Sequence, residues 1–405
     1  MPFASTSRVQ IAYAKETAFG VIDAAAPSKY LRVTSEGLGY NVTKETSAEL
    51  NKNRGSSSMV PVSAEASGPL SGELSYGEWD EFMAATLQAD NGWEGASATG
   101  ATLTVTTTTV TAGAAIPAFA TLKPGQWFVL PGAAEGKNKG KLLRVHPTTV
   151  PTTTVITLDT KTPAVAEVIN AAAFNSHRIS NGTLQDSWTL ERQITDVSEF
   201  FAYRGMTAAS MNLTLGTGAI STIEVNFMGR DTSPKNATQL KTPVLSSFAG
   251  EVMSGASGTS CGVYWKGDQI TDAFMNQVTL SYDNALRMQQ ALCSLGAVGI
   301  GSGTIVLTVE AQMFFAHGRK FYSEFLANES QELAFTAFDT QGNGYVFTLP
   351  KANVSNYVIN AGGKDQDLLV TVSFTGLLDM THANAAMRGK LLFIDRTGIL
   401  PVRPA

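Results

Sequence analysis

Hydrophobic and polar residues alternate in several short stretches of the chain, which is the pattern of β-strands that bury one face and wet the other. The clearest stretch is residues 304–314, and the same alternation occurs in residues 220–228 and 70–76. Because strands wetted on one face are typical of antiparallel sheets, the pattern predicts a mainly β protein. In the clearest stretch, the two alternating sets are Ile305, Leu307, Val309, Ala311 and Met313 against Thr304, Val306, Thr308, Glu310 and Gln312.

Helical periodicity is limited to two short segments, and each of them directly follows an alternating strand. The expected apolar stripes are Trp79, Phe82, Met83 and Leu87 within residues 77–88, and Phe321, Phe325 and Leu326 within residues 318–328. Because a strand followed by a short helix occurs twice, the sequence predicts an internal duplication.

Breaks in composition divide the chain into two β-rich parts, the first of which is interrupted. Residues 90–180 contain a Thr- and Ala-rich opening and short strands parted by Gly and Pro, which predicts a small all-β insert at the surface. Residues 233–260 combine Pro, Gly and Ser without a period, as a linker does. The expected boundaries are 1–89 and 181–232 for the first domain, 90–180 for the insert, 233–260 for the linker, 261–382 for the second domain and 383–405 for a C-terminal arm.

The composition indicates a covered surface and excludes some classes of protein. Of the 405 residues, 43% are hydrophobic and only 16% are charged, against about 25% in typical soluble proteins. The formal net charge of −5 disfavours a general nucleic-acid binder, which depends on cationic side chains. Cys261 and Cys293 form no spaced framework and the first residues lack a signal-peptide pattern, so we expect a protein made and kept in a reducing cytosol. No stretch approaches the roughly 18 consecutive apolar residues of a membrane helix, and no membrane insertion is expected.

Motifs that resemble catalytic or ligand-binding signatures lack the context that their chemistry requires. Residues 258–262 match G-x-S-x-G, but strand-like sequence follows them where a nucleophile elbow needs a helix. The glycines of residues 296–303 precede a strand and lack the Lys-Ser/Thr of a phosphate-binding loop. The four histidines show no metal-ligand spacing, and residues 339–344 fit a hairpin turn better than a calcium loop. The sequence therefore predicts a structural protein with no catalytic residues, no cofactor and no metal.

Several segments occur in an order that resembles one protein family. They are residues 12–20 (AYAKETAFG), 31–38 (LRVTSEGL), 72–83 (GELSYGEWDEFM), 187–191 (SWTLE), 203–206 (YRGM), 281–287 (SYDNALR), 339–350 and 362–365 (GGKD). Together they resemble the major tail tube proteins of long-tailed, siphovirus-type bacteriophages, and the resemblance spans about residues 8–379.

This resemblance implies a virion protein, assembled in the bacterial cytoplasm, whose rings stack into a hollow tube. The implied fold is a β-sandwich or partial barrel with a short flanking helix. Because the sequence also predicts an internal duplication, we expect two tandem domains of this kind plus the small all-β insert. Single-domain tube subunits form six-membered rings, so two such domains in one chain imply three chains per ring. The implied partners are further copies of the chain, the tail terminator, the baseplate or tip proteins, the tape measure protein inside the lumen, and double-stranded DNA that passes without being held.

Two groups of residues are candidates for functional surfaces. The polar sides of two alternating strands are candidates for the lumen, although alternation leaves open whether that face meets the lumen, another β-layer or another subunit. Long polar loops are expected at residues 43–58, 193–205, 284–299 and 351–367. The resemblance implies that long loops reach the next ring, and residues 43–58 are the candidate for this contact. The candidates are Thr222, Glu224, Thr308, Glu310 and Gln312 for the lumen, and Lys44, Glu45, Glu49, Lys52 and Arg54 for the inter-ring loop.

A carbohydrate-binding or adhesin-like β-sandwich surface protein is the competing interpretation. It rests on Trp127 and Phe128 in the insert, because aromatic side chains are what such a site would offer to a sugar. An enzyme is the third and weakest class, since no reactive cluster supports it.

Overall fold

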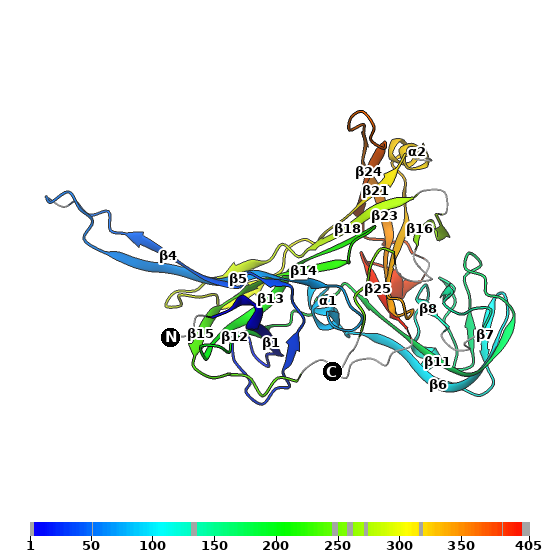
Figure 1. The fold of residues 1–405 in the computed structure, drawn as a ribbon, viewed down its shortest axis with the longest axis horizontal. Helices are drawn as coiled ribbons and strands as arrows, with labels where there is room; N and C mark the ends of the chain where they lie inside the picture. Colours follow the sequence, from blue (N-terminus) through cyan, green and yellow to red (C-terminus); the bar gives the residue numbers. More distant parts are fainter. Residues whose placement is uncertain are drawn as a thin grey trace.

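The protein is built almost entirely from antiparallel strands, as the alternation predicts (Figure 1). The computed structural model describes residues 4–50, 52–130, 136–244, 250–256, 262–270, 274–315, 319–382 and 384–398. The prediction of a mainly β, sandwich-type fold is confirmed.

The first set of strands forms two layers that share one long strand, β13. One layer runs β2–β1–β12–β13–β15 and the other runs β4–β5–β14–β13, with β3 also paired to β5. The elements of this first strand set are β1 (Val9–Lys15), β2 (Lys29–Leu31), β3 (Ser35–Glu36), β4 (Gly39–Thr46), β5 (Met59–Glu73), α1 (Asp80–Thr86), β12 (Trp188–Ile194), β13 (Glu199–Gly216), β14 (Thr222–Gly229) and β15 (Asp231–Lys235).

A second strand set repeats this pairing pattern around the long strand β23. Its layers run β17–β16–β22–β23–β25 and β18–β21–β24–β23. The elements of this second strand set are β16 (Val263–Trp265), β17 (Asp268–Gln269), β18 (Met275–Asp283), β21 (Val306–Phe314), α2 (Arg319–Ala327), β22 (Ser330–Phe338), β23 (Gly344–Asn360), β24 (Leu369–Gly376) and β25 (Phe393–Thr397).

The two long strands are bent, and each passes from one layer to the other. In β13, residues 199–206 pair with β12 and β15, whereas residues 207–216 pair with β14 and β18. Gly205 lies at the change of partner with a φ of +67°, a conformation that favours glycine. In β23, Pro350 lies at the corresponding change, where a residue without an N–H group fits a break in the ladder.

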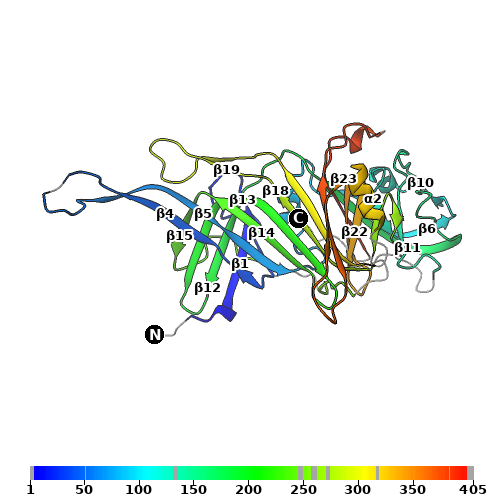
Figure 2. The ribbon, with the colours of Figure 1, turned by 90° about the horizontal axis from the view of Figure 1, so that it is seen from above.

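The pairing of β13 with β18 joins the two strand sets into one continuous sheet. This sheet runs β4–β5–β14–β13–β18–β21–β24–β23, and we call it the long sheet. Figure 2 shows β14, β13 and β18 running side by side across the junction.

Each helix fills the space over the long sheet with one aromatic side chain. The ring centroid of Phe82 in α1 lies 5.2 Å from that of Phe227 in β14 and 4.8 Å from that of Tyr13 in β1, so Phe82 contacts both layers of the first strand set. The ring centroid of Phe321 in α2 lies 5.7 Å from that of Phe374 in β24 and 5.6 Å from that of Trp265 in β16. The two predicted helices are therefore present. The predicted stripe of α2 was wrong at one position, because Leu326 is exposed.

The insert leaves the first strand set after α1 and returns before β12, with a hydrophobic core of its own. It docks on the second strand set, where Arg144 forms a bidentate ion pair with Glu332 at 2.7 and 2.6 Å. Its strands are β6 (Glu94–Val105), β7 (Thr109–Ala112), β8 (Trp127–Val129), β9 (Leu142–Arg144), β10 (Val155–Thr157) and β11 (Glu167–Ser180). Outside these sets lie a small hairpin, β19 (Arg287–Gln289) with β20 (Gly299–Gly301), and three 3₁₀ turns, η1 (Thr6–Arg8), η2 (Pro117–Thr121) and η3 (Ala385–Met387).

Several segments that the sequence presented as loops or arms contain paired strands. Residues 199–205 and 351–360 were expected in polar loops but belong to β13 and β23, because the bent strands break the simple alternation. Within residues 383–405, expected as a C-terminal arm, β25 is buried between β11 and β23.

The Arg178–Asp395 ion pair should be essential to the docking of the insert. Both side chains are buried, and the Arg178 guanidinium donates two hydrogen bonds to the Asp395 carboxylate at 2.6 and 2.7 Å. Asp395 also accepts a hydrogen bond from the backbone N–H of Trp127 at 3.1 Å. Asp395→Ala leaves Arg178 buried without its counter-charge, so we expect the free energy of unfolding to fall by about 3–5 kcal/mol. Chemical denaturation of the unassembled subunit measures this, with the exposed Asp367→Ala as control. Equal stability of the two variants would contradict the prediction.

Candidate functional site

The long sheet has one buried face and one polar face. In β14, Ile223 and Val225 point into the core while Thr222 and Glu224 lie on the opposite side. The same division holds in β21, where the predicted apolar residues from Leu307 to Met313 are buried. The alternation that the sequence showed is therefore the division between the core and this polar face.

Cross-strand pairing brings the predicted lumen residues into neighbouring rows on the polar face. Glu224 and Thr308 belong to one row, Thr222 and Glu310 to the next, and Gln312 to a third. The sequence did not single out the other members, which only the register reveals. The first row is Ser71, Glu224, Asn212, Ser281, Thr308, Thr375 and Asn353; the second is Glu73, Thr222, Thr214, Thr279, Glu310, Ser373 and Asn356; the third includes Gln277, Gln312 and Thr371.

These rows carry hydroxyl, amide and carboxylate groups but no cation. Glu224 accepts hydrogen bonds from Ser71 Oγ at 3.2 Å and from Asn226 Nδ2 at 3.3 Å, so neighbouring side chains orient its carboxylate. Glu73 and Glu310 add negative charge in the next row, and none of the row positions is Lys or Arg. A surface of this kind offers phosphate groups no ion pair.

The predicted inter-ring residues lie on a hairpin that projects far from the rest of the molecule (Figure 1). We call residues 42–62 of the β4–β5 hairpin the arm. Lys44 and Glu45 are on β4, and Glu49, Lys52 and Arg54 are near the tip, where all of them are exposed. The expected loop of residues 43–58 is thus partly a strand pair, since Thr46 pairs with Met59. The structure does not bring these charges together with the polar face.

The long sheet ends in two strand edges that are open within the part of the chain the structure describes. At one end β4 pairs only with β5, and at the other residues 354–360 of β23 pair only with β24. An open edge presents unpaired N–H and C=O groups, so it is a ready site for strand addition.

A sequence model of the phage tail tube protein family matches residues 6–376. The chain belongs to the phage tail tube protein family. No curated protein sequence matches the chain. Membership makes this tube protein a structural component of a phage virion and confirms the family that the resemblance indicated.

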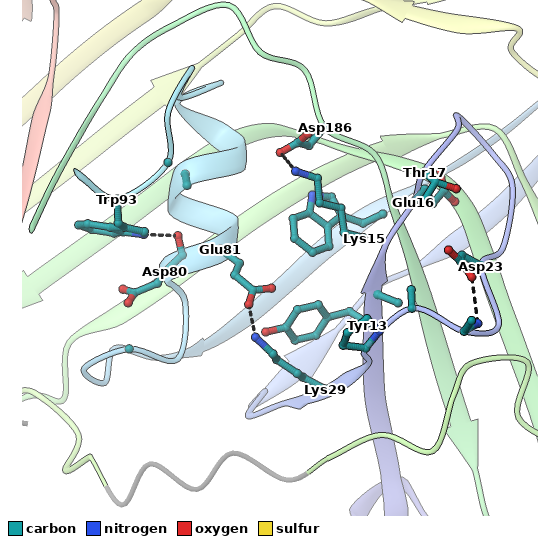
Figure 3. Close-up of a pocket in the computed structure, with 18 of the residues that line it drawn as sticks. Tyr13, Lys15, Glu16, Thr17, Asp23, Lys29, Asp80, Glu81, Trp93 and Asp186 are labelled. Carbon is teal, nitrogen blue, oxygen red and sulfur yellow. Dashed lines mark hydrogen bonds and ion pairs between the residues drawn. The ribbon is translucent and has the colours of Figure 1, made fainter. Parts of the chain in front are cut away.

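The tube protein also contains a cavity of about 1190 Å³ between α1 and the layer of β1 and β2 (Figure 3). Charged groups on its wall are paired with each other: Lys29 Nζ lies 2.5 Å from Glu81 and Lys15 Nζ lies 2.7 Å from Asp186. At its inner end, Asp80 pairs with Arg396 and accepts the Tyr345 hydroxyl. Pairs of this kind hold the wall together.

The structure describes some of the other motifs considered from the sequence. Within the described residues, no three His, Cys, Asp or Glu side chains are placed to hold a metal, and no helix is long and apolar enough to cross a membrane. Asp339 accepts the N–H groups of Gln341 and Asn343 in a hairpin turn. Most of the G-x-S-x-G segment, residues 258–261, lies outside the described residues.

Trp127 and Phe128, the basis of the carbohydrate-binding interpretation, are both 0% exposed. Trp127 packs against Tyr264 of β16 with ring centroids 4.8 Å apart, and its indole N–H donates to Thr348 Oγ1 at 3.1 Å. Trp127 therefore holds the insert to the second strand set, whereas Phe128 packs in the insert's own core, and neither buried ring can stack on a sugar.

His177, on the cavity wall, makes stability depend on pH. Burial, together with the nearby Arg396, lowers the pKa of His177 to about 4 from its usual 6.5. Protonation of His177 is therefore harder in the folded state than in the unfolded state. The stability that neutral His177 contributes is complete above pH 6.5 and is lost as the pH falls toward 4. His177→Gln should weaken the loss of stability between pH 7 and 5, measured as denaturant midpoints. His382→Gln is the matched control, and an unchanged pH dependence in His177→Gln would contradict the assignment.

Proposed function

We propose that the chain polymerises into closed rings that stack into the phage tail tube, the conduit for DNA ejection. The observation that carries this proposal is the junction of β13 with β18 together with the two open edges. In the repeated pairing pattern, β4 corresponds to β18 and β23 corresponds to β13. The junction that forms once within the chain can therefore form again only between chains, from β23 of one subunit to β4 of the next.

Three chains would complete such a ring. Each chain supplies two strand sets, taken as two tube domains in the boundaries given above, so three chains make a pseudo-sixfold ring. The contact is head-to-tail, and it closes only if each step rotates by the same amount as the step within the chain. Closure also removes the open strand edges that would otherwise favour uncontrolled aggregation.

The polar face of the long sheet is the proposed lining of the lumen. Tyr13, Phe82, Trp265 and Phe321 all pack on its other face, so the second layers and both helices lie on that side. A barrel with this bulk outside has its polar face inside. Three long sheets together exceed the about 16–18 strands at which a barrel leaves an open channel.

The remaining partners follow from the position of a tube within a tail. The arm, with its exposed tip charges, is proposed to contact the adjacent ring. A tape measure protein would occupy the lumen during assembly, and a terminator and baseplate or tip proteins would meet the tube ends. Assembly in the host cytoplasm is part of the same proposal.

Cysteine crosslinking tests both the edge contact and the ring size. Asn41→Cys in β4 and Asn356→Cys in β23, with Cys261 and Cys293 replaced by Ser, place one thiol near each open edge. A short bis-maleimide should give a covalent ladder that ends at three chains, whereas either cysteine alone should give none. A ladder that continues to six chains would contradict the ring size. Intact tubes without a ladder would contradict the edge contact.

Charge reversal tests the lining. Tubes of Glu224→Lys/Glu310→Lys should retain short double-stranded DNA that wild-type tubes release, because each new phosphate contact adds salt-dependent affinity. Filter retention at several salt concentrations measures the affinity for DNA. The slope of log affinity against log salt concentration should steepen by about 0.9 for each phosphate contact. The Glu224→Gln/Glu310→Gln tubes are the control. Lysine tubes that behave like wild type would place these side chains away from the channel.

A further inference from the structure

Two apolar positions in and just after the two helices differ sharply in exposure. In α1, Met83 and Leu87 are both 0% exposed. In α2, Tyr322 is 45% and Leu326 is 67% exposed. The second helix thus presents large apolar side chains at the end where the first helix is covered.

The two helices occupy equivalent places in the repeated pattern. Each follows the strand that pairs with β14 or β24, and each packs a phenylalanine on that partner strand. Each also ends before a residue in the left-handed conformation, Gln88 with φ +49 and Asn328 with φ +53. The surroundings of one helix end are therefore a guide to those of the other.

The end of α1 is covered by the connection from β18 to β21, residues 284–305. Asn284 Nδ2 donates to the Thr86 carbonyl at 2.7 Å, and Gln88 Nε2 donates to Ser302 Oγ at 2.7 Å. Both ends of the connection thus meet α1 at the junction between the strand sets. The middle of the connection reaches β5, where Ala64 N–H donates to the Leu295 carbonyl at 2.9 Å.

The counterpart of this connection in the first strand set is the arm, which extends freely from the molecule (Figures 1 and 2). Near its base, Val42 is 36% and Val62 is 44% exposed. Val42 pairs across the hairpin with Ala64, which is buried, so Val42 continues the core face of the sheet. Val62 is the extra residue of a β-bulge between the Thr43–Ser63 and Lys44–Pro61 pairs, next to this position. The arm base therefore carries an apolar strip without a cover.

We propose that the base of the arm docks on the last turn of α2 in the neighbouring copy of this chain. Val42 and Val62 would then cover Tyr322 and Leu326, as residues 284–305 cover the end of α1 within the chain. The contact continues the β23–β4 ladder and rests on the proposed ring. It assigns the arm base to a contact within the ring and leaves the arm tip for the adjacent ring.

Assembly of two single variants tests this contact. Leu326→Glu and Val62→Glu should each raise the concentration needed for half-assembly by about ten- to a hundredfold, the range expected for one large apolar side chain. Light scattering and electron microscopy measure assembly. Thermal unfolding of the unassembled subunit should stay unchanged, because both side chains are exposed there. The charge pair Leu326→Glu/Val62→Lys should recover much of the loss.

Two controls separate this contact from general effects. Val168→Glu places the same charge on an exposed apolar position of the insert, where Val168 is 60% exposed, and should assemble normally. A variant in which residues 47–58 are replaced by Asn-Gly keeps the arm base and should still form rings. If wild type assembles and either single glutamate variant assembles equally well, the contact is wrong while the ring stands. If wild type forms no rings, the proposed function fails and the contact with it.

Discussion

Residues 207–216 of β13 have β14 on one side and β18 on the other, and through this second ladder the two strand sets become one sheet. The rows of the polar face cross this ladder without a break, since Asn212 pairs with Ser281. The ladder also sets the positions of the open edges at β4 and β23, because every intervening strand has two neighbours. The polar face and the edges therefore exist as continuous features only because this one pairing is made.

The bend of β13 depends on a buried carboxylate rather than on apolar packing alone. Glu16 accepts hydrogen bonds from the N–H groups of Gly20 and Gly205 at 2.8 and 2.9 Å, and from the hydroxyls of Ser187 and Thr189 at 2.7 and 2.8 Å. It thereby satisfies the backbone at the point where β13 leaves one layer for the other. A buried carboxylate with four donors is stable where an unpaired one is not.

The sequence predicted the features that arise from neighbouring residues and missed those that arise from distant ones. Alternation correctly gave the buried and polar sides of β14 and β21, and helical spacing gave α1 with all of its stripe buried. The bent strands were missed, because Gly205 and Pro350 look like loop residues until their partners are known. Trp127 looked like a binding residue because its partner Tyr264 is far along the chain. The rows of the polar face, the open edges and the Asp80–Arg396 pair likewise depend on register and long-range contacts that one sequence does not encode locally.

The covalent link between the two strand sets divides the junctions of the proposed ring into those formed within a chain and those formed between chains. A contact made within a chain is formed at a high effective concentration, so in the proposed ring every second junction is present before subunits meet. That leaves the other junctions to control assembly, and they are the ones with open edges and exposed apolar side chains. The two sets are also free to differ: the first carries the insert and the projecting arm, while the connection in the second folds back onto its neighbour. A chain with a single strand set would have to place an insert and an arm at every position of the ring, whereas this chain places them at every second one.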